Sequence, residues 1–272
     1  MYKPFRAIIS DLDGTLLNRD HKIGQFTIET LEKLAKQGVD IYLATGRNYP
    51  DVKQIISKVN VQDAMLVTSN GARANNLAGE QLASYYLPEN LAFEIMTKTP
   101  FDKQMVCLNS YQGDEWFINV DVEQLRKYHQ DSGFMYQVVD FNQHHAKQTE
   151  KIFFIGRNPE CLLPVEQHIQ QTYGELVQMT YSTPQCLEIM AKGVCKANTL
   201  KELVKLKGYE LSDCISFGDG MNDVEMLALA GKGCVMGNAD SRLKQRLPNN
   251  EVIGSNKDEA VASYIRAIFG LR

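Results

Sequence analysis

The feature that most constrains this chain is a regular alternation of strand-like and helix-like segments over its first 70 residues. Short apolar runs at 7–9, 41–44 and 65–68 are separated by helical patterns at 26–36 and 50–59. Parallel strands need a long crossover between them, and a helix is the usual crossover. The alternation therefore predicts an α/β fold in which a parallel sheet carries helices on its faces.

The same alternation returns near the end of the chain. Helical patterns at 197–206 and 223–230 alternate with strands at 214–217 and 234–236, and an amphipathic helix at 258–269 follows. The simplest interpretation is that these segments complete the sheet that the first 70 residues begin.

The segment between these two parts, residues 85–187, has a different texture. It spans 103 of the 272 residues but holds 15 of the 24 aromatic residues and four of the five histidines, which indicates a separate unit. Its mixture of helices and turn-connected strands is typical of an α+β domain with an antiparallel sheet. We predict a Rossmann-like parallel-sheet core formed by residues 1–84 and 188–272, with an α+β domain inserted at 85–187.

Composition excludes several classes of function. Lys and Arg number 29 against 33 Asp and Glu, a net charge of -4, so no basic excess is available to bind a nucleic acid. The apolar runs are strand-sized, well short of the ~20 residues needed to span a bilayer, and the N-terminus lacks a signal-peptide pattern. We expect a cytoplasmic protein that binds neither nucleic acid nor membrane and has no obligate protein partner.

The six cysteines are widely spaced, without C-x-x-C pairs or histidines at zinc-site spacing. We interpret them as reduced, small core residues. A catalytic thiol is the alternative, and Cys195 is its candidate because the neighbouring Lys196 would lower a thiol pKa.

Polar residues cluster directly after three of the predicted core strands. The clusters are Asp11-Leu12-Asp13-Gly14-Thr15, Thr45-Gly46-Arg47 and Gly218-Asp219-Gly220-Met221-Asn222-Asp223. In an open parallel sheet the carboxyl ends of the strands line one crevice. We therefore expect the three clusters to converge in space, although they are far apart in the sequence.

The clusters contain four carboxylates, those of Asp11, Asp13, Asp219 and Asp223. Carboxylates that meet at one place raise each other's pKa unless a cation compensates them. Because no Cys or His lies in the clusters, the oxygen ligands favour a hard divalent ion such as Mg²⁺, which also binds water and a substrate phosphate. One carboxylate of the first cluster can then act as a nucleophile and the other as an acid and base.

Three further residues suit a bound phosphate. Gly14 permits the close backbone turn that a phosphate on adjacent N–H groups requires. Thr45 offers a hydroxyl donor, and Lys196 brings positive charge to the start of a helix, where the helix dipole disfavours a lysine. An anion bound there would reverse that preference.

Each of these signals also has a purely structural interpretation. Asp-x-Asp-Gly is a common turn sequence, and Asn222 with Glu225 three residues later matches a helix-capping pattern. Lys196 alone would be interpreted as a surface lysine. The combination favours a functional site, because every cluster follows a strand of the same predicted sheet.

The motifs resemble those of the haloacid dehalogenase superfamily, in particular its Cof-type phosphatases. The run Asp11-Leu12-Asp13-Gly14-Thr15-Leu16-Leu17 is similar to the first family motif, Thr45-Gly46-Arg47 to the second, Lys196 to the third, and the run from Gly218 to Asp223 to the fourth. The insert at 85–187 resembles the α+β cap of the type IIB members. Within the family, the chain is most similar to bacterial enzymes that act on pyridoxal phosphate and sugar phosphates.

The resemblance implies a phosphatase that works through an aspartyl-phosphate intermediate. Asp11 would attack phosphorus, and Asp13 would protonate the leaving oxygen and then deprotonate the hydrolytic water. The phosphoryl oxygens would be held by Thr45, the Gly46 amide, the Leu12 amide, Lys196 and Asn222.

The resemblance also implies Mg²⁺ as the cofactor. The Asp11 carboxylate, the Asp13 backbone carbonyl and the Asp219 carboxylate would bind the ion. Asp223 would lie behind these ligands and orient water or Lys196.

The inserted cap is expected to close over the crevice and to select the leaving group. Its exposed candidate contacts are Trp116, Tyr111, Tyr181 and the polar stretch 109–115, with core packing as the alternative for the aromatic residues. The pair His144-His145 has no third ligand nearby, so we interpret it as a solvated loop.

The substrate expected from the resemblance is a small-molecule phosphomonoester, and two rival functions share the same motifs. A phosphomutase or phosphotransferase would use the same aspartyl-phosphate but pass the phosphoryl group to a hydroxyl group. A catalytically silent sensor of phosphate ligands would usually lack the nucleophile or the acid, whereas Asp11 and Asp13 are both present.

Overall fold

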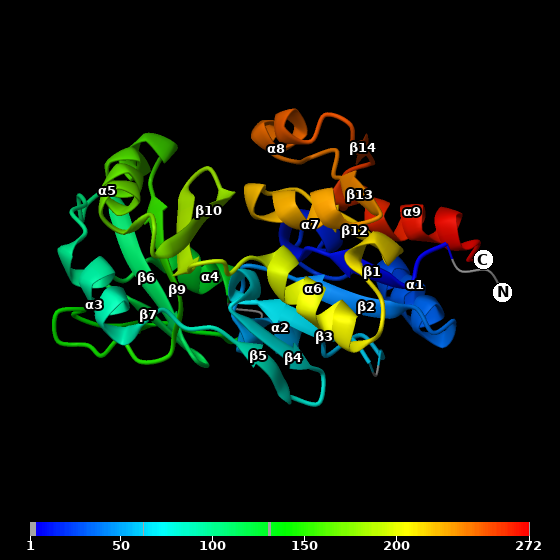
Figure 1. Ribbon diagram of the computed structural model, residues 1–272, viewed down its shortest axis with the longest axis horizontal. Helices are drawn as coiled ribbons and strands as arrows, with labels where there is room; N and C mark the ends of the chain where they lie inside the picture. The colour runs from blue at the N-terminus through cyan, green and yellow to red at the C-terminus, as the bar shows by residue number, and fades with distance from the viewer. Residues whose placement is uncertain (1–3, 62, 130–131, 272) are drawn as a thin grey trace.

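The structure is a computed structural model that describes residues 4–61, 63–129 and 132–271. It consists of two lobes, each built on its own β-sheet (Figure 1). The larger lobe takes its strands from both ends of the chain, and the smaller lobe takes its strands from the middle. Each sheet packs on its own large hydrophobic cluster, so each lobe has a core of its own.

In the described residues, the larger sheet has eight strands in the order β14-β13-β12-β1-β2-β3-β4-β5. The strands from β14 to β3 are parallel, and β4 and β5 extend one edge as antiparallel strands. The bounds are β1 (Ala7–Ser10), β2 (Asp40–Ala44), β3 (Met65–Thr68), β4 (Arg73–Asn76), β5 (Gln81–Ser84), β12 (Cys214–Gly218), β13 (Lys232–Val235) and β14 (Glu251–Val252).

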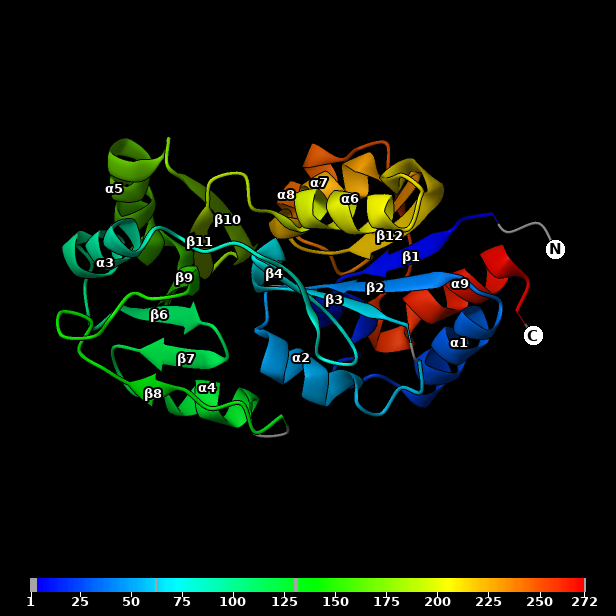
Figure 2. The same ribbon diagram turned by 60° about the horizontal axis from the view of Figure 1, so that its bottom comes forward.

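Helices cover both faces of this sheet, as Figure 2 shows. On one face lie α1 (Gln25–Lys36), α2 (Tyr49–Ile56) and α9 (Ala260–Phe269); on the other lie α6 (Lys196–Leu206), α7 (Val224–Leu229) and α8 (Ser241–Arg246). A strand enclosed on both faces can be apolar throughout, which explains uninterrupted buried runs such as that of β1.

The smaller sheet has the order β10-β11-β9-β6-β7-β8. Its pairings are antiparallel except for that of β7 with β8. The bounds are β6 (Val106–Gln112), β7 (Glu115–Ile118), β8 (Gln137–Val138), β9 (Thr149–Gly156), β10 (Val177–Thr183) and β11 (Cys186–Ala191). Its helices are α3 (Glu89–Lys98), α4 (Glu123–Tyr128) and α5 (Leu163–Tyr173).

Side chains of the smaller sheet alternate between its two faces. Ile152 and Phe154 of β9 pack in the core that α3 and α5 cover, whereas Lys151 and Phe153 line a cavity shared with the larger lobe. The smaller sheet therefore presents one face to its own helices and the other to the strand ends of the larger sheet.

The predicted fold class is confirmed: a parallel-sheet α/β core carries an inserted α+β unit. The division at 84/85 and 187/188 stays a prediction, and β11 continues past the second of these points to Ala191. The short elements β4, β5, β8, α8 and β14 were not predicted, because they are brief and lack a clear apolar period. No helix in the described ranges is both long and apolar enough to cross a membrane.

Candidate active site

The three polar clusters lie at the carboxyl ends of neighbouring parallel strands. Asp11 follows β1, Thr45 follows β2 and Asp219 follows β12, and β1 is hydrogen-bonded to both of the other strands. The structure therefore brings the clusters together at one edge of the sheet. Their side chains line a cavity of about 620 Å³ between the two lobes.

The loop after β1 turns sharply and packs against Asp219. Residues Leu12–Leu16 form a single distorted helical turn, in which Gly14 has a φ of +74°, a conformation that favours glycine. A β-carbon on Gly14 would overlap the carboxylate of Asp219. Gly14 therefore permits the turn and also leaves the space that Asp219 occupies.

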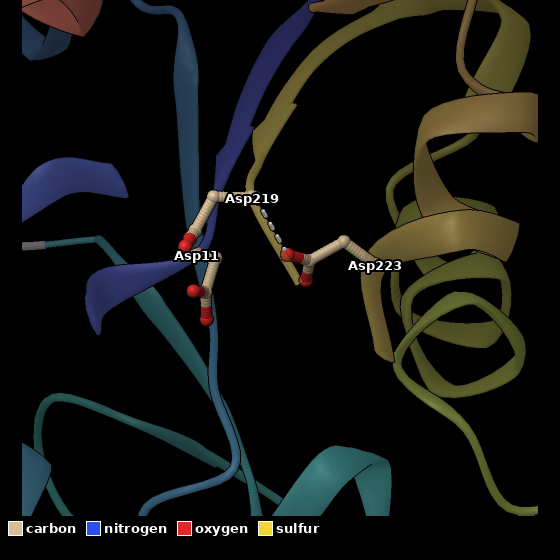
Figure 3. Close-up of side chains that lie close together, drawn as sticks. All are labelled: Asp11, Asp219 and Asp223. Atoms are coloured by element: carbon tan, nitrogen blue, oxygen red, sulfur yellow. Dashed lines mark hydrogen bonds between the residues drawn. The ribbon is translucent and has the colours of Figure 1, made fainter. Parts of the chain in front are cut away.

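Three carboxylates converge at this edge (Figure 3). Asp11, Asp219 and Asp223 each place one oxygen within 4.8 Å of the others. Burial, reinforced by the neighbouring Asp223, raises the pKa of Asp219 to about 7. Burial also holds the pKa of Asp11 well above its usual range, although Lys196 opposes the shift. The charged forms of Asp11 and Asp219 are therefore disfavoured at this place, and Lys196 offsets this only in part.

Lys196 supplies part of the compensating charge. It is the first residue of α6, its side chain is fully buried, and its Nζ lies 2.7 Å from Oδ1 of Asp11 and 2.7 Å from Oδ1 of Asp223. Burial disfavours the charged ammonium, but the two carboxylates outweigh burial and raise the pKa of Lys196. The alternative interpretation, a solvated surface lysine, is therefore wrong.

Both oxygens of Asp223 are engaged by the protein. Oδ1 accepts a hydrogen bond from Lys196, and Oδ2 accepts the backbone N–H groups of Asp219 and of the next residue, both at 2.9 Å. Asp219 accepts a bond from Thr15 at Oδ1 (2.7 Å), and Asp11 accepts that of Lys196 at Oδ1. Within the described part of the chain, Oδ2 of Asp11 and Oδ2 of Asp219 accept none. These two oxygens are the ones available to a cation.

Thr45, Gly46 and Asn222, three of the predicted phosphate-binding residues, line the core side of this cavity. Lys196, for which the same role is predicted, is fully buried against Asp11 and does not line the cavity. Oγ1 of Thr45 accepts the N–H of Arg47 at 3.1 Å, which leaves the hydroxyl hydrogen available to a ligand. Nδ2 of Asn222 donates to Oδ1 of Asn70 at 3.0 Å. The Leu12 side chain is buried in the core, so the role predicted for Leu12 rests on its backbone amide.

Asp13 is held by a residue to which the sequence analysis assigned no role. Nε of Arg47 donates to Oδ2 of Asp13 at 2.6 Å, and Nη2 donates to Oδ1 at 2.7 Å. Nη1 of Arg47 donates to Oδ2 of Asp51 at 2.8 Å. Arg47 belongs to the second cluster, and Asp51 follows it at the i+4 spacing of helical ion pairs, so a signal was present.

A residue of the smaller lobe continues the chain of contacts from Asp13 through Arg47 to Asp51. Nδ1 of His129, which follows α4, lies 3.2 Å from Oδ2 of Asp51. Burial favours the neutral form of Asp51, but the contacts with His129 and Arg47 outweigh burial and lower its pKa. The row Asp13, Arg47, Asp51 and His129 therefore connects the proposed acid and base to the smaller lobe.

Aromatic side chains of the smaller lobe form the opposite wall of the cavity. Tyr111, Trp116 and Phe153 all line it, and the Tyr111 ring centre lies 5.9 Å from that of Trp116 and 4.8 Å from that of Phe153. The expectation that Tyr111 and Trp116 are exposed is wrong, since they are 5% and 1% exposed. Both side chains lie on the face of the β6–β7 hairpin that is directed toward the larger lobe. They pack against each other there and border the cavity.

Other predicted contacts of the cap lie elsewhere. Tyr181 does not border this cavity, and its hydroxyl donates to Glu166 at 2.9 Å. In the stretch 109–115, Asn109, Ser110 and Gln112 are buried in the smaller lobe, so the expectation of an exposed polar surface is wrong for them. Two charged residues that the sequence analysis missed, Lys151 and Glu188, do border it.

The remaining candidates have structural surroundings. His144 and His145 lie in a loop and stack on each other at 4.3 Å, and among the described residues only Asp11, Asp219 and Asp223 form a group that could hold a metal. Burial raises the pKa of the Cys195 thiol, which favours the interpretation of a packing residue over that of an activated nucleophile.

The fold and the site define a capped phosphohydrolase with a parallel-sheet core. The sequence profile of the haloacid dehalogenase-like hydrolases matches residues 8–265, and the chain belongs to this family. A Haemophilus influenzae protein that is provisionally named a phosphatase is 54% identical to this chain over 271 residues, which cover 100% of this chain and 99% of that protein. The chain is a phosphatase, a phosphoric monoester hydrolase.

A more distant relative agrees with this assignment, and a solved structure has the same fold. The HMP-PP phosphatase of Yersinia pestis is 36% identical over 261 residues, which cover 96% of this chain and 94% of that protein. The structure of a sugar phosphatase of HAD subclass IIB is similar with a TM-score of 0.82 at 24% identity, covering 98% of this chain and 100% of that one. The latter likeness shows that the two proteins share a fold.

Proposed function

We propose that this phosphatase hydrolyses small phosphomonoesters through an aspartyl-phosphate formed on Asp11, with Mg²⁺ as its cofactor. The observation that carries the proposal is the position of Asp11, which borders the cavity with one oxygen held by Lys196 and lies beside Asp219. Phosphoryl transfer depends on positioning the nucleophile and neutralising charge, and this arrangement serves both needs.

The reaction would proceed in two steps. An oxygen of Asp11 attacks phosphorus, the bond from phosphorus to the ester oxygen breaks, and Asp13 gives its proton to the departing alcohol. A water then attacks the phosphorus of the aspartyl-phosphate while Asp13 takes a proton from that water. Inorganic phosphate leaves, Asp11 is restored as a carboxylate, and Asp13 ends the cycle protonated, as it began.

The phosphoryl oxygens would bind to donors on the core side of the cavity. These donors are the Thr45 hydroxyl, the Asn222 amide and the backbone amides of Leu12 and Gly46. The Lys196 ammonium, which is buried against Asp11, would add its positive charge and its hydrogen bonds to theirs. Thr45, Asn222 and Lys196 are each held by a hydrogen bond within the protein. Donors that are fixed before the substrate arrives stabilise the charge of the transition state without reorganising.

The residues of the site fit a magnesium ion. The Asp11 and Asp219 carboxylates and the Asp13 backbone carbonyl would hold it, and Asp223 would orient Lys196 from behind. The raised pKa of Asp219, about 7, comes from burial and from the charge of Asp223, and a divalent ion would offset that charge. When bound, Mg²⁺ would neutralise negative charge on the transferring phosphoryl group.

We infer pyridoxal phosphate and sugar phosphates as the substrate classes, with a preference for a ring of aromatic character. The support is the wall formed by Tyr111, Trp116 and Phe153, because aromatic faces and edges pack favourably against a flat ring. The relatives named HMP-PP phosphatase make HMP-PP a further candidate.

The first experiment measures phosphate release from 4-nitrophenyl phosphate with Mg²⁺ and with EDTA. We expect hydrolysis by the wild type with Mg²⁺ only, and none by Asp11→Asn. Asp13→Ala should still bind inorganic phosphate but lose ~10²–10⁴-fold in turnover, the usual contribution of acid–base catalysis. Turnover by Asp11→Asn at the wild-type rate would overturn the proposal.

The second experiment separates substrates and rival functions. A panel of pyridoxal phosphate, hexose phosphates and HMP-PP, ranked by kcat/KM, identifies the preferred leaving group. A phosphotransferase would yield a phosphorylated acceptor instead of inorganic phosphate. A silent sensor would bind members of the panel and release no phosphate.

A further inference from the structure

A buried ion pair of the smaller lobe is hydrogen-bonded to two segments of the larger lobe, at Gly46 and at Asn70. Lys151 on β9 and Glu188 on β11 are neighbours in the smaller sheet, and Nζ lies 2.5 Å from Oε1 with both side chains 3% exposed. Neither residue has a part in the proposed chemistry. Burying two charges costs stability unless further hydrogen bonds satisfy them, so their other partners indicate what the pair does.

Lys151 reaches the second cluster. Its Nζ donates to the carbonyl oxygen of Gly46 at 2.6 Å. This carbonyl belongs to the peptide group whose N–H, on Arg47, donates to Oγ1 of Thr45 at 3.1 Å. Because a peptide group is planar, fixing its carbonyl also fixes the N–H that orients the Thr45 hydroxyl. Lys151 therefore supports a proposed phosphoryl ligand from the opposite lobe.

Glu188 supports the fourth cluster in a similar way. Its Oε2 accepts a hydrogen bond from Nδ2 of Asn70 at 2.6 Å, and Oδ1 of Asn70 accepts one from Nδ2 of Asn222 at 3.0 Å. An amide nitrogen carries two hydrogens, so Asn222 keeps one for a phosphoryl oxygen. Glu188 thus fixes Asn70, and Asn70 fixes the direction of Asn222.

The ammonium of Lys151 is also held from the side of the aromatic wall. Its Nζ lies 4.8 Å from the ring centre of Tyr111 and 4.6 Å from that of Phe153, within the range of cation–π attraction. The ion pair is therefore anchored in the wall that would contact the leaving group, while its hydrogen bonds reach Gly46 and Asn70, which support the groups that would contact the phosphoryl group.

We propose that Lys151 and Glu188 are positioning residues that couple the seating of the smaller lobe on the larger one to the assembly of the phosphoryl-binding groups. When the smaller lobe moves away, the bonds to Gly46 and Asn70 are lost together, and Thr45 and Asn222 lose their support. This inference rests on the proposed function, because Thr45 and Asn222 act in it as phosphoryl ligands.

The test removes the pair without leaving an unpaired charge. Replacing a buried ion pair by apolar residues of similar volume is often neutral or stabilising, so we expect Lys151→Met/Glu188→Met to fold and melt near the wild-type temperature. With 4-nitrophenyl phosphate and Mg²⁺, its kcat should fall about tenfold or more, since small misplacements of binding groups are costly. Lys98→Met, which breaks the exposed pair with Glu94, is the matched control and should leave kcat unchanged.

Hydrogen–deuterium exchange gives a readout that does not depend on turnover. Backbone amides of residues 45–48 and 69–72 should exchange faster in the double variant than in the wild type or in Lys98→Met. Lys151→Arg keeps the charge and its donors, so it should restore most of this protection and part of kcat.

A folded double variant with wild-type kcat and wild-type exchange in these two segments would overturn the inference. If the wild type releases no phosphate with Mg²⁺, the proposed function fails instead. The exchange measurement then still decides whether the ion pair holds the two loops.

Discussion

The guanidinium of Arg47 donates two hydrogen bonds to the carboxylate of Asp13, at 2.6 and 2.7 Å. A two-point contact fixes both the plane and the direction of a carboxylate, which a single hydrogen bond does not. The guanidinium is itself anchored, because Nη1 donates to the buried Asp51 at 2.8 Å. Arg47 therefore sets the direction in which the proposed acid and base faces the cavity.

Arg47→Lys should lower kcat by about 10- to 100-fold, because an ammonium cannot make the two-point contact and Asp13 would lose its fixed direction. KM should change little, since the groups proposed to bind the phosphoryl oxygens stay in place. Steady-state kinetics with 4-nitrophenyl phosphate and Mg²⁺ measure both constants. Arg19→Lys, at an exposed position, is the control. A variant as fast as the wild type would show that Asp13 needs no such support.

Gly14→Ala should both destabilise the protein and weaken its use of Mg²⁺, and backbone strain alone accounts only for the first effect. Gly14 has a φ of +74°, and a β-carbon there would overlap the Asp219 carboxylate. We expect the Mg²⁺ concentration for half-maximal activity to rise, together with a loss of stability of about 1 kcal/mol or more from the left-handed backbone.

Gly193→Ala is a matched control for this substitution. Gly193 has a similar φ of +77° but no atom within 4 Å of an added β-carbon. It should show the loss of stability without the change in Mg²⁺ requirement. An equal response of the two variants would mean that the contact of Gly14 with Asp219 has no bearing on the metal.

The core side of the site could be predicted from the sequence because its residues follow short, apolar strands. Asp11, Thr45 and Asp219 each come directly after such a strand, and parallel pairing places the ends of the strands at one edge. Local chemistry also points to Gly14, through the turn it permits, and to Lys196, through its place at the start of a helix. In each case the signal lies within a few residues of the position it concerns.

The contribution of the smaller lobe could not be predicted in this way. A polar residue on an antiparallel strand usually faces water, so nothing in the local sequence indicates that Lys151 and Glu188 are buried. Their burial depends on the larger lobe, and Lys151 meets Gly46 across 105 residues of sequence. The role of Arg47 likewise depends on Asp13, 34 residues away, and periodicity carries no such information.

The buried Glu150 should make folding stability decrease as pH rises. Its carboxylate accepts a hydrogen bond from Ser69 at 2.6 Å and lies 3.7 Å from Arg73. Burial nevertheless raises its pKa from 4.5 to about 7. Between these two values the folded state keeps a proton that the unfolded chain has lost. The free energy of unfolding should therefore fall across this interval and remain lower above it.

Glu150→Gln should remove this dependence, because the amide has no proton to lose. At pH 8 the variant should be more stable than the wild type by up to about 3 kcal/mol, and the two proteins should converge near the unfolded-state pKa of 4.5. Urea unfolding at a series of pH values measures the difference. A difference that does not change with pH would show that another group, not Glu150, is titrating.

Magnesium should stabilise the folded protein by binding to the carboxylates of Asp11 and Asp219. An ion that binds only the folded state raises the free energy of unfolding by about 2.7 kcal/mol when its concentration is a hundred times Kd. Melting curves in EDTA and in excess Mg²⁺ measure this gain. A wild-type melting temperature that does not respond to Mg²⁺ would contradict a metal site at these carboxylates.

Asp219→Asn should be more stable than the wild type in EDTA and less stable than the wild type in excess Mg²⁺. Without metal the variant should melt at a higher temperature than the wild type, because burial and the charge of Asp223 already penalise the charged form of Asp219. With Mg²⁺ the variant should gain little, because the amide removes the charge that attracts the ion, and the wild type should become the more stable protein. Asp20→Asn, at an exposed position, should follow the wild type in both conditions. If Asp219→Asn instead gained as much from Mg²⁺ as the wild type, Asp219 could not be a ligand, and the ion would have to bind through other oxygens of the loop.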